Sequence, residues 1–117
     1  MGVRTTVDTS AARRRLEDML ADLDRSIALL RAAYGGGSDR HPADTVAHLM
    51  DVDQAEASLL TLGRQRNAVL AALQRISAGT YGRCVTCSVP VAEGRLEARP
   101  DAARCVPCQS RYDRARR

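Results

Sequence analysis

Large apolar side chains recur along the first part of the chain at the spacing of a coiled-coil helix. The stripe consists of six residues at alternating steps of four and three positions: Leu16, Leu20, Leu23, Ile27, Leu30 and Tyr34. This alternation places them on one face of an α-helix. Thr9 or Ser10 can cap the start of the helix, and Gly35-Gly36-Gly37 favours non-helical backbone at its end. The pattern predicts a helix of about 25 residues, roughly 37 Å long.

A second apolar stripe follows between Pro42 and Gly79, and no further Pro or paired Gly interrupts the chain between these two residues. Pro42 suits the first position of a helix. The stripe contains Val52, Ala55, Leu59, Leu62, Val69, Leu73 and Ile76. Because a seven-residue, Gly-rich connection between two helices favours an antiparallel pair, we predict a coiled-coil hairpin over residues 10–79. Its turn lies near residues 35–46, which we call the tip.

Arg66 occupies one position of the second stripe, and Gly63 lies one turn before it. Arg66 has two interpretations: a side chain that extends its charge to solvent, or a device that fixes the register of the helix pair. Gly63 suits either a bend or a close crossing of the two helices. The sequence does not choose among these interpretations.

All four cysteines lie in the last third of the chain, as two Cys-x-x-Cys pairs separated by 17 residues: Cys84 and Cys87, then Cys105 and Cys108. Four thiolates satisfy tetrahedral Zn²⁺ without an open position, so the spacing predicts one structural zinc ion. Two disulfides, a redox pair and an iron–sulfur centre are the alternatives. Disulfides need an oxidising compartment and a redox pair normally accompanies a βαβ pattern, whereas the sequence does not separate zinc from iron.

Composition limits the architecture. The 117 residues include 19 alanines, only 26 Val, Ile, Leu or Met, and no Phe or Trp. That supply is small for a compact core, because folding must offset about 1–2 kcal/mol of backbone entropy per residue. No apolar run reaches the roughly 18–20 residues of a membrane span, and the N-terminus lacks the apolar core of a secretory signal. We expect a cytoplasmic, monomeric, all-α protein: an antiparallel coiled-coil hairpin, a four-cysteine zinc finger and a short C-terminal helix.

These patterns divide the chain into three parts. Residues 1–9 form a flexible N-terminal segment, residues 10–79 the hairpin, and residues 80–117 the zinc finger with a basic C-terminal tail. The last part, residues 80–117, is called the finger below.

Around the cysteines, the sequence resembles the DksA/TraR family of bacterial transcription regulators, which carry a four-cysteine zinc finger. The resemblance is carried by Tyr81-Gly82-Arg83-Cys84-Val85-Thr86-Cys87 and by Arg95-Leu96-Glu97-Ala98-Arg99-Pro100 before the second Cys pair. It implies a non-enzymatic regulator that binds RNA polymerase directly, without binding DNA. It also implies that the coiled coil enters the secondary channel of the polymerase and modulates promoter complexes.

The resemblance assigns the tip a functional role. The family pattern Asp-x-x-Asp-x-Ala falls on His41-Pro42-Ala43-Asp44-Thr45-Val46, so Asp44 is retained while His41 and Val46 replace the first Asp and the Ala. A carboxylate near catalytic magnesium or mobile basic elements can change their positions. Asp44 is therefore the leading functional residue. His41, Asp44, His48 and Asp51 share one helical stripe, which is interpreted as a solvated polar face rather than a second metal site.

Some family members respond to ppGpp through basic side chains around the finger and the adjacent coiled coil. Arg99 matches one such position, whereas the neighbouring positions fall on Ala68 and Gln109. The resemblance therefore leaves Arg99 as a contact for either ppGpp or the polymerase.

Two alternative functions stay open, and the charge of the chain supports the first of them. The net charge of +4 comes from 18 arginines, without lysine, against 14 acids, and the middle of the chain is acidic because residues 38–62 hold five acids against the single base Arg40. If the termini pack together, two groups of arginines, residues 13–15 and residues 111–117, form a basic region near the hairpin base. Such a region is typical of a nucleic-acid-binding zinc ribbon, although we expect no aromatic residue to interleave with this basic region. A dimerising coiled-coil adaptor is the other alternative. An enzyme is disfavoured, since no nucleophile–base pair, phosphate loop or open metal site is evident.

Overall fold

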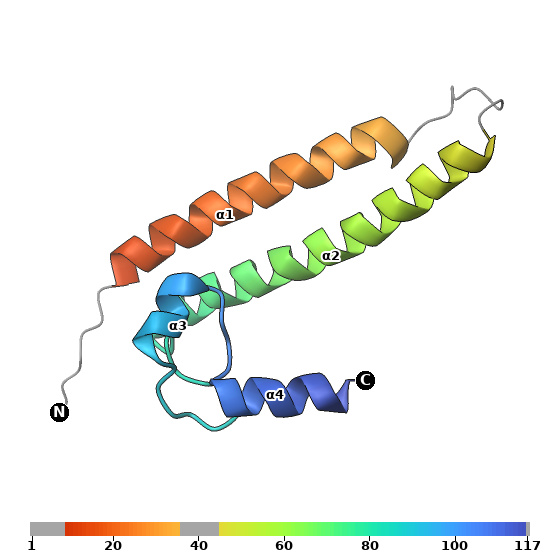
Figure 1. Cartoon of the computed structure of the whole chain (residues 1–117). Helices are drawn as coiled ribbons and strands as arrows, with labels where there is room; N and C mark the ends of the chain where they lie inside the picture. The colour runs from red at the N-terminus through yellow and green to blue at the C-terminus, as the bar shows by residue number, and fades with distance from the viewer. Residues whose placement is uncertain (1–8, 36–44, 117) are drawn as a thin grey trace.

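The computed structural model describes residues 9–35 and 45–116, and the side chains of residues 45–49 are not among those described. Its elements are the helices α1 (Thr9–Leu30), α2 (Thr45–Ala78), α3 (Glu93–Ala98) and α4 (Val106–Ala115), with a π-helical turn, η1 (Arg31–Gly35), after α1. The described residues contain no named strand, only an isolated antiparallel bridge between Arg83 and Pro90. The prediction of an all-α hairpin followed by a finger and a short C-terminal helix is confirmed (Figure 1).

The two long helices form an elongated antiparallel pair, and the finger packs at one end of it (Figure 1). The molecule measures 67 × 31 × 20 Å. Only α1 and α2 share an extensive helix–helix contact among the described elements. The finger lies where α1 begins and α2 ends, which we call the base of the hairpin, and the end of α1 and the start of α2 lie at the opposite end of the rod (Figure 1).

The predicted apolar stripes form the seam between α1 and α2. Leu16 and Val69 are fully buried, and Ile27, Ala55 and Ile76 are buried to nearly the same extent. The core is best developed near the finger, where Leu16, Val69, Ala72 and Ile76 form one cluster. Ala72 was not part of the predicted stripe. It lies one helical turn after Val69, so the buried face of α2 is wider at the base than a strict seam.

The structure distinguishes the interpretations left open for Arg66 and Gly63. The Arg66 Nε donates to Asp24 Oδ1 of the opposite helix at 2.6 Å, and both side chains are partly exposed. This pairing matches the register interpretation, because it links two fixed positions on different helices. A Cβ added at Gly63 would meet no atom within 4 Å. Close crossing of the helices therefore does not account for this glycine.

The predicted end of the second helix is confirmed, whereas the predicted cap of the first helix is not. Helix α2 ends at Ala78, followed by Gly79 with φ of +82°. The Gly79 N–H bonds Ile76 O at 3.2 Å and the Thr80 N–H bonds Arg75 O at 2.9 Å, which is the Schellman arrangement that glycine favours. At the other end, α1 already includes Thr9 and Ser10, so these residues lie in its first turn and not before it.

The tip lies largely outside the described residues. Pro42 precedes the described start of α2 at Thr45, so its predicted role as the first helical residue falls outside them. The first helix does end in the predicted region, since the π-helical turn stops at Gly35. No helix in the described ranges 9–35 and 45–116 is long and apolar enough to cross a membrane.

Helix α3 was not predicted. It is six residues long and contains the Arg-Leu-Glu-Ala part of the string between the cysteine pairs. It ends before Arg99, whose φ of −137° and ψ of 88° are the extended values expected of a residue that precedes proline. Leu96 anchors the helix by packing on a small cluster formed by Cys84, Val91 and Cys108.

Candidate functional site

The four cysteine sulfurs converge on one point. All four Sγ atoms lie within 4.8 Å of one another, and the Sγ atoms of Cys87 and Cys105 are 3.8 Å apart. Cys84 and Cys108 are buried, Cys105 is half-buried and Cys87 is exposed. Thus one side of the cluster faces the small core of the finger and the other faces solvent.

This geometry fits a four-thiolate zinc ion. A Zn–S distance of about 2.3 Å in a tetrahedron corresponds to sulfur–sulfur edges of about 3.8 Å. The Cys87–Cys105 distance has that value, and the 4.8 Å limit on the remaining distances requires only small side-chain movements. Among the described residues this is the only group of three or more Cys, His, Asp or Glu side chains close enough to share an ion. A site closed by four thiolates has a structural role.

The first pair of cysteines sits in a tight loop held by backbone hydrogen bonds. The Cys84 N–H bonds Val89 O at 2.8 Å, and the Ser88 N–H bonds Cys84 O at 2.9 Å. Ser88 adopts a φ of 68°, which allows the chain to reverse after Cys87. The loop therefore presents both sulfurs toward the same side.

The second pair lies at the start of α4. Cys105 occupies the position before the helix and Cys108 lies in its first turn, with Pro107 between them. The Gln109 N–H bonds Cys105 O at 2.8 Å, which closes this turn. Proline is well suited to the first turn, because its missing N–H would have no partner there.

Two of the four thiols have shifted pKa values, in opposite directions. Burial opposes ionisation of Cys84, but bonds from the backbone N–H groups of Cys105, Cys87 and Thr86 outweigh it and lower the pKa to about 5. The pKa of Cys108 is raised to about 12, first by burial and then by bonds with the other thiols. The Arg111 Nη2 also donates to Cys108 Sγ at 3.2 Å. Because zinc binds thiolates, its binding must displace the proton of Cys108.

A polar joint connects the finger to the coiled coil. The Tyr81 hydroxyl donates to Pro100 O at 2.8 Å, while the Tyr81 ring packs against the hairpin core. The Arg75 Nη2 contacts Ala102 O at 3.4 Å. Burial lowers the pKa of Arg75, and the charge of Asp101 opposes that shift.

Asp101 is the buried charged residue of the part of the chain that the structure describes, with 8% exposure. Its Oδ2 lies 3.7 Å from Arg99 Nη2. The sequence patterns named Tyr81 only as part of the string that carries the resemblance, and they missed Arg75 and Asp101. The only signal for Asp101 was its position directly after the Arg-Leu-Glu-Ala-Arg-Pro string.

The predicted tip residues lie at or beyond the boundary of the described part of the chain. His41 and Asp44 lie outside the described residues, and Val46 lies in α2 without a described side chain. Asp51 and Asp53 are exposed near the start of α2 and make this end of the rod acidic. The roles of His41, Asp44 and Val46 therefore stay predictions.

Arg99, the predicted ppGpp or polymerase contact, is exposed at the joint. It lines a groove of about 340 Å³ between α1, α2 and the end of α3, together with Arg15 and Asp101. Ala68 and Gln109, which align with the other two positions, provide no cation. The contact of Arg99 with ppGpp or with the polymerase stays a prediction.

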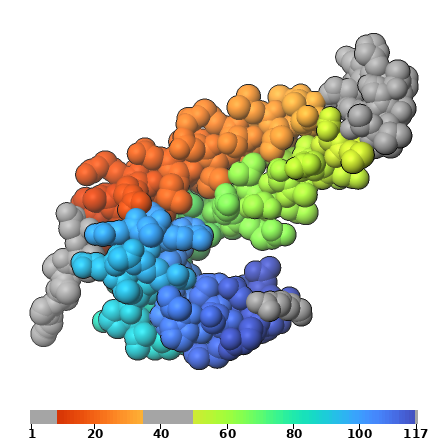
Figure 2. All heavy atoms as spheres, viewed as in Figure 1, coloured from red at the N-terminus to blue at the C-terminus, as the bar shows by residue number. Residues whose placement is uncertain are grey.

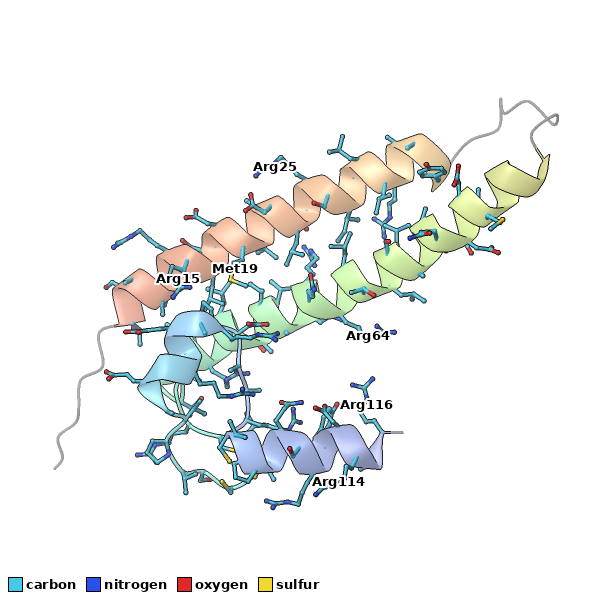
Figure 3. The ribbon with its side chains drawn as sticks, viewed as in Figure 1. Arg15, Met19, Arg25, Arg64, Arg114 and Arg116 are labelled. Carbon is cyan, nitrogen blue, oxygen red and sulfur yellow. The ribbon has the colours of Figure 1, made fainter. Side chains whose placement is uncertain are left out.

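The two predicted groups of arginines do not form one region. Arg15 lies on α1, while Arg114 and Arg116 lie near the far end of α4, well away from it (Figure 3). The basic charge of the finger is therefore distributed along α4 and not gathered with the start of α1.

Comparisons with known proteins agree on a family. Residues 79–114 match the family described as "Prokaryotic dksA/traR C4-type zinc finger". The chain is 33% identical over 95 residues to the RNA polymerase-binding transcription factor DksA of two Caulobacter vibrioides strains, and this match covers 67% of this chain and 67% of each relative. These relatives are named as transcription factors, the non-enzymatic class predicted from the sequence.

Two solved structures share the fold. The transcription factor DksA2 of Pseudomonas aeruginosa has a TM-score of 0.65 and 23% identity, covering 91% of this chain and 80% of that one. The DnaK suppressor protein of Agrobacterium tumefaciens C58 has a TM-score of 0.58 and 24% identity, covering 94% of this chain and 98% of that one. Both likenesses extend over the hairpin and the finger, so they support the arrangement of the whole chain.

Proposed function

Because the chain belongs to the DksA/TraR family of C4-type zinc-finger proteins, we propose that it regulates transcription by binding RNA polymerase. The observation that carries this proposal is the match to relatives named as RNA polymerase-binding transcription factors, together with the family's finger at residues 79–114. The protein acts as a ligand of the polymerase and carries out no chemistry of its own.

The shape of the molecule suggests how it binds. Helix α2 alone, with 34 residues, spans about 51 Å. A narrow rod of this length can enter the secondary channel while the finger, which widens the opposite end, stays at the channel entrance. The tip then reaches toward the catalytic centre, and the finger limits the depth of insertion.

Asp44 is the functional group of the tip in this proposal. Its carboxylate acts on catalytic magnesium or on mobile basic elements of the polymerase and changes the lifetime of promoter complexes. His41 and Val46 stand beside it in place of the family's Asp and Ala, so this tip carries one carboxylate of the family pattern. The exposed acids Asp51 and Asp53 add negative charge along the inserted end.

Zinc is the structural partner of the proposed regulator. Cys84, Cys87, Cys105 and Cys108 hold one ion, whose binding supplies folding free energy to a segment with few apolar residues. The ion takes no direct part in regulation in this proposal. It fixes the finger so that α3 and the polar joint can hold the coiled coil at one angle.

A transcription assay with a point variant tests the role of the tip. Asp44→Asn removes the charge at similar size, so we expect the variant to bind core RNA polymerase as the parent does but to alter open-complex lifetime less. Equal effects of variant and parent would remove Asp44 from the mechanism. Asp18→Asn, on α1, is the matched control, and we expect it to behave as the parent.

Binding to core RNA polymerase, measured with and without ppGpp, tests the role of Arg99. Arg99 is the one cation that this chain provides at the three aligned positions, so we propose that it acts mainly as a contact to the polymerase. Arg99→Ala is then expected to weaken binding to the polymerase with and without ppGpp. Loss of an effect that appears only with ppGpp would assign Arg99 to the nucleotide.

A further inference from the structure

Helix α4 brings an aromatic ring and two arginines together on one face. The Cζ atom of Arg104 lies 3.8 Å from the centroid of the Tyr112 ring, and that of Arg116 lies 5.5 Å from it. The expectation that no aromatic residue interleaves with the basic region is wrong: Tyr112 lies between Arg111 and Arg114 in the sequence, and the structure adds Arg104 and Arg116 around its ring. Arg104 precedes α4 by two positions, so its contact with Tyr112 is not evident from linear order.

Arg104 is held in a fixed orientation. Its Nε donates to Thr86 Oγ1 at 3.3 Å, and its backbone carbonyl accepts a bond from Arg95 Nε at 3.0 Å. With Nε bonded to Thr86 and the guanidinium against the Tyr112 ring, the two terminal nitrogens are the remaining donors of the group. A guanidinium in this state has already lost much of the side-chain freedom that binding would otherwise cost.

These arginines carry charge that the protein does not neutralise. In the described ranges 9–35 and 45–116, the ion pairs join Arg25 to Asp22, Arg66 to Asp24 and Arg99 to Asp101. Arg104 and Arg116 take part in none of them. The one acid of α4, Asp113, accepts a hydrogen bond from Gln109.

The two arginines at the end of α4 point in opposite directions. In Figure 3, Arg116, which directly follows α4, points toward the α2 side, whereas Arg114 points away on the opposite side of α4. Figure 2 shows that the atoms of α4 stand apart from those of the middle of α2, with an indentation between them. Arg116 and not Arg114 is therefore on the side of α4 that faces this indentation.

We propose that this surface, formed by Arg104, Tyr112 and Arg116, binds the backbone and bases of single-stranded nucleic acid. Arginine forks match phosphate geometry, and bases stack on aromatic rings and on guanidinium planes. Basic side chains interleaved with an exposed aromatic ring are typical of single-strand binding surfaces. Tyr112 stays 40% exposed although both guanidiniums lie over its ring, and an acidic protein segment would use the charges but not this exposed part of the ring.

Fluorescence anisotropy tests the proposal on the full zinc-loaded chain, with 12-nucleotide single-stranded RNA and DNA as probes. Two or three phosphate contacts predict that affinity falls about 7- to 20-fold between 50 and 200 mM NaCl. Arg116→Glu is expected to weaken binding at least tenfold. Arg114→Glu, which makes the same charge change on the opposite side of α4, is the matched control and should weaken it no more than threefold. Both side chains are exposed, and Arg116→Glu also removes the contact of its guanidinium with the Tyr112 ring, which belongs to the proposed surface.

Three results would overturn the proposal: no binding to either probe, equal weakening by the two variants, or displacement of the probe by poly-glutamate as effectively as by unlabelled RNA. The second result would indicate attraction by net charge alone, and the third would identify an acidic protein as the partner. None of these outcomes depends on RNA polymerase, so the proposal stands or fails independently of the regulatory function.

Discussion

The hydroxyl of Tyr81 and the carbonyl oxygen of Pro100 lie 2.8 Å apart and form a hydrogen bond that joins the two parts of the molecule. Tyr81 follows the end of α2 and packs on the hairpin core, whereas Pro100 is buried at the end of the string between the cysteine pairs. Because the described residues show no extensive contact between α3 or α4 and the long helices, this bond and its neighbours fix how the finger sits on the coiled coil.

Tyr81→Phe is expected to lower the free energy of unfolding by about 1 kcal/mol. The change removes one hydroxyl while keeping the ring, and it leaves the buried Pro100 carbonyl without its donor. Urea unfolding followed by circular dichroism measures the effect. Tyr112→Phe, which removes a hydroxyl from an exposed ring, serves as control and should cost less than about 0.5 kcal/mol. Equal losses would show that the Tyr81 bond does not stabilise the joint.

The joint also predicts a pH dependence. Burial raises the pKa of Tyr81 above its usual value of about 10, with Arg75 and Arg15 opposing the shift. A group with a raised folded-state pKa stabilises the fold fully below its unfolded pKa, and that contribution is lost as pH rises through the folded value. The difference in absorbance at 295 nm between the parent and Tyr81→Phe reports the titration. A midpoint at or below about 10 would contradict the burial of this hydroxyl.

Loss of one zinc ligand is expected to remove both the ion and the finger's fold. Cys84→Ser leaves three thiolates and disrupts a cluster in which Cys84, Val91 and Cys108 form the finger's core. Metal analysis should give about one zinc per parent chain and much less for the variant, and hydrogen exchange should increase in the finger. Ser110→Ala, at an exposed position of α4, should retain the parent's zinc. A folded, zinc-free variant would contradict the structural role of the ion.

Truncation of the hairpin core is expected to destabilise the coiled coil. Leu16 is fully buried, so Leu16→Ala should cost about 2–5 kcal/mol. Leu29 is on the same helix but 70% exposed, and Leu29→Ala should change the stability by less than about 0.5 kcal/mol. Denaturant unfolding compares them. Similar costs for both substitutions would mean that the two helices do not pack along the assigned seam.

The ion pair between Arg66 and Asp24 provides a test of register. A double-mutant cycle with Arg66→Ala and Asp24→Ala should give a coupling of about 0.2–1 kcal/mol, because both side chains are partly exposed. The coupling should fall as salt is added. A coupling of zero at low salt would show that these residues do not face each other in solution.

Spacing in the sequence predicted the elements whose side chains repeat or converge by simple geometry. The alternating steps from Leu16 to Tyr34 and the two Cys-x-x-Cys pairs were sufficient to predict the hairpin and the sulfur cluster. The Schellman turn at Gly79 was also predicted as the end of the helix.

Features that depend on contacts across the chain were missed. Asp101 and Arg75 are 26 positions apart, and burial of their charges follows from how the finger folds back onto α2. Helix α3 is too short to show an apolar period, and the stack of Arg104 on Tyr112 joins a loop to a helix. Such arrangements require the tertiary fold, which local patterns do not contain.

The tip of the hairpin is proposed to carry the interaction with RNA polymerase. Co-migration of the zinc-loaded protein with bacterial core RNA polymerase tests this proposal, in comparison with a version that lacks residues 38–50 and retains zinc and helical structure. We expect the parent to co-migrate and the removal of residues 38–50 to abolish or strongly weaken binding. Undiminished binding by the shortened version, or no binding by the parent, would contradict the proposal.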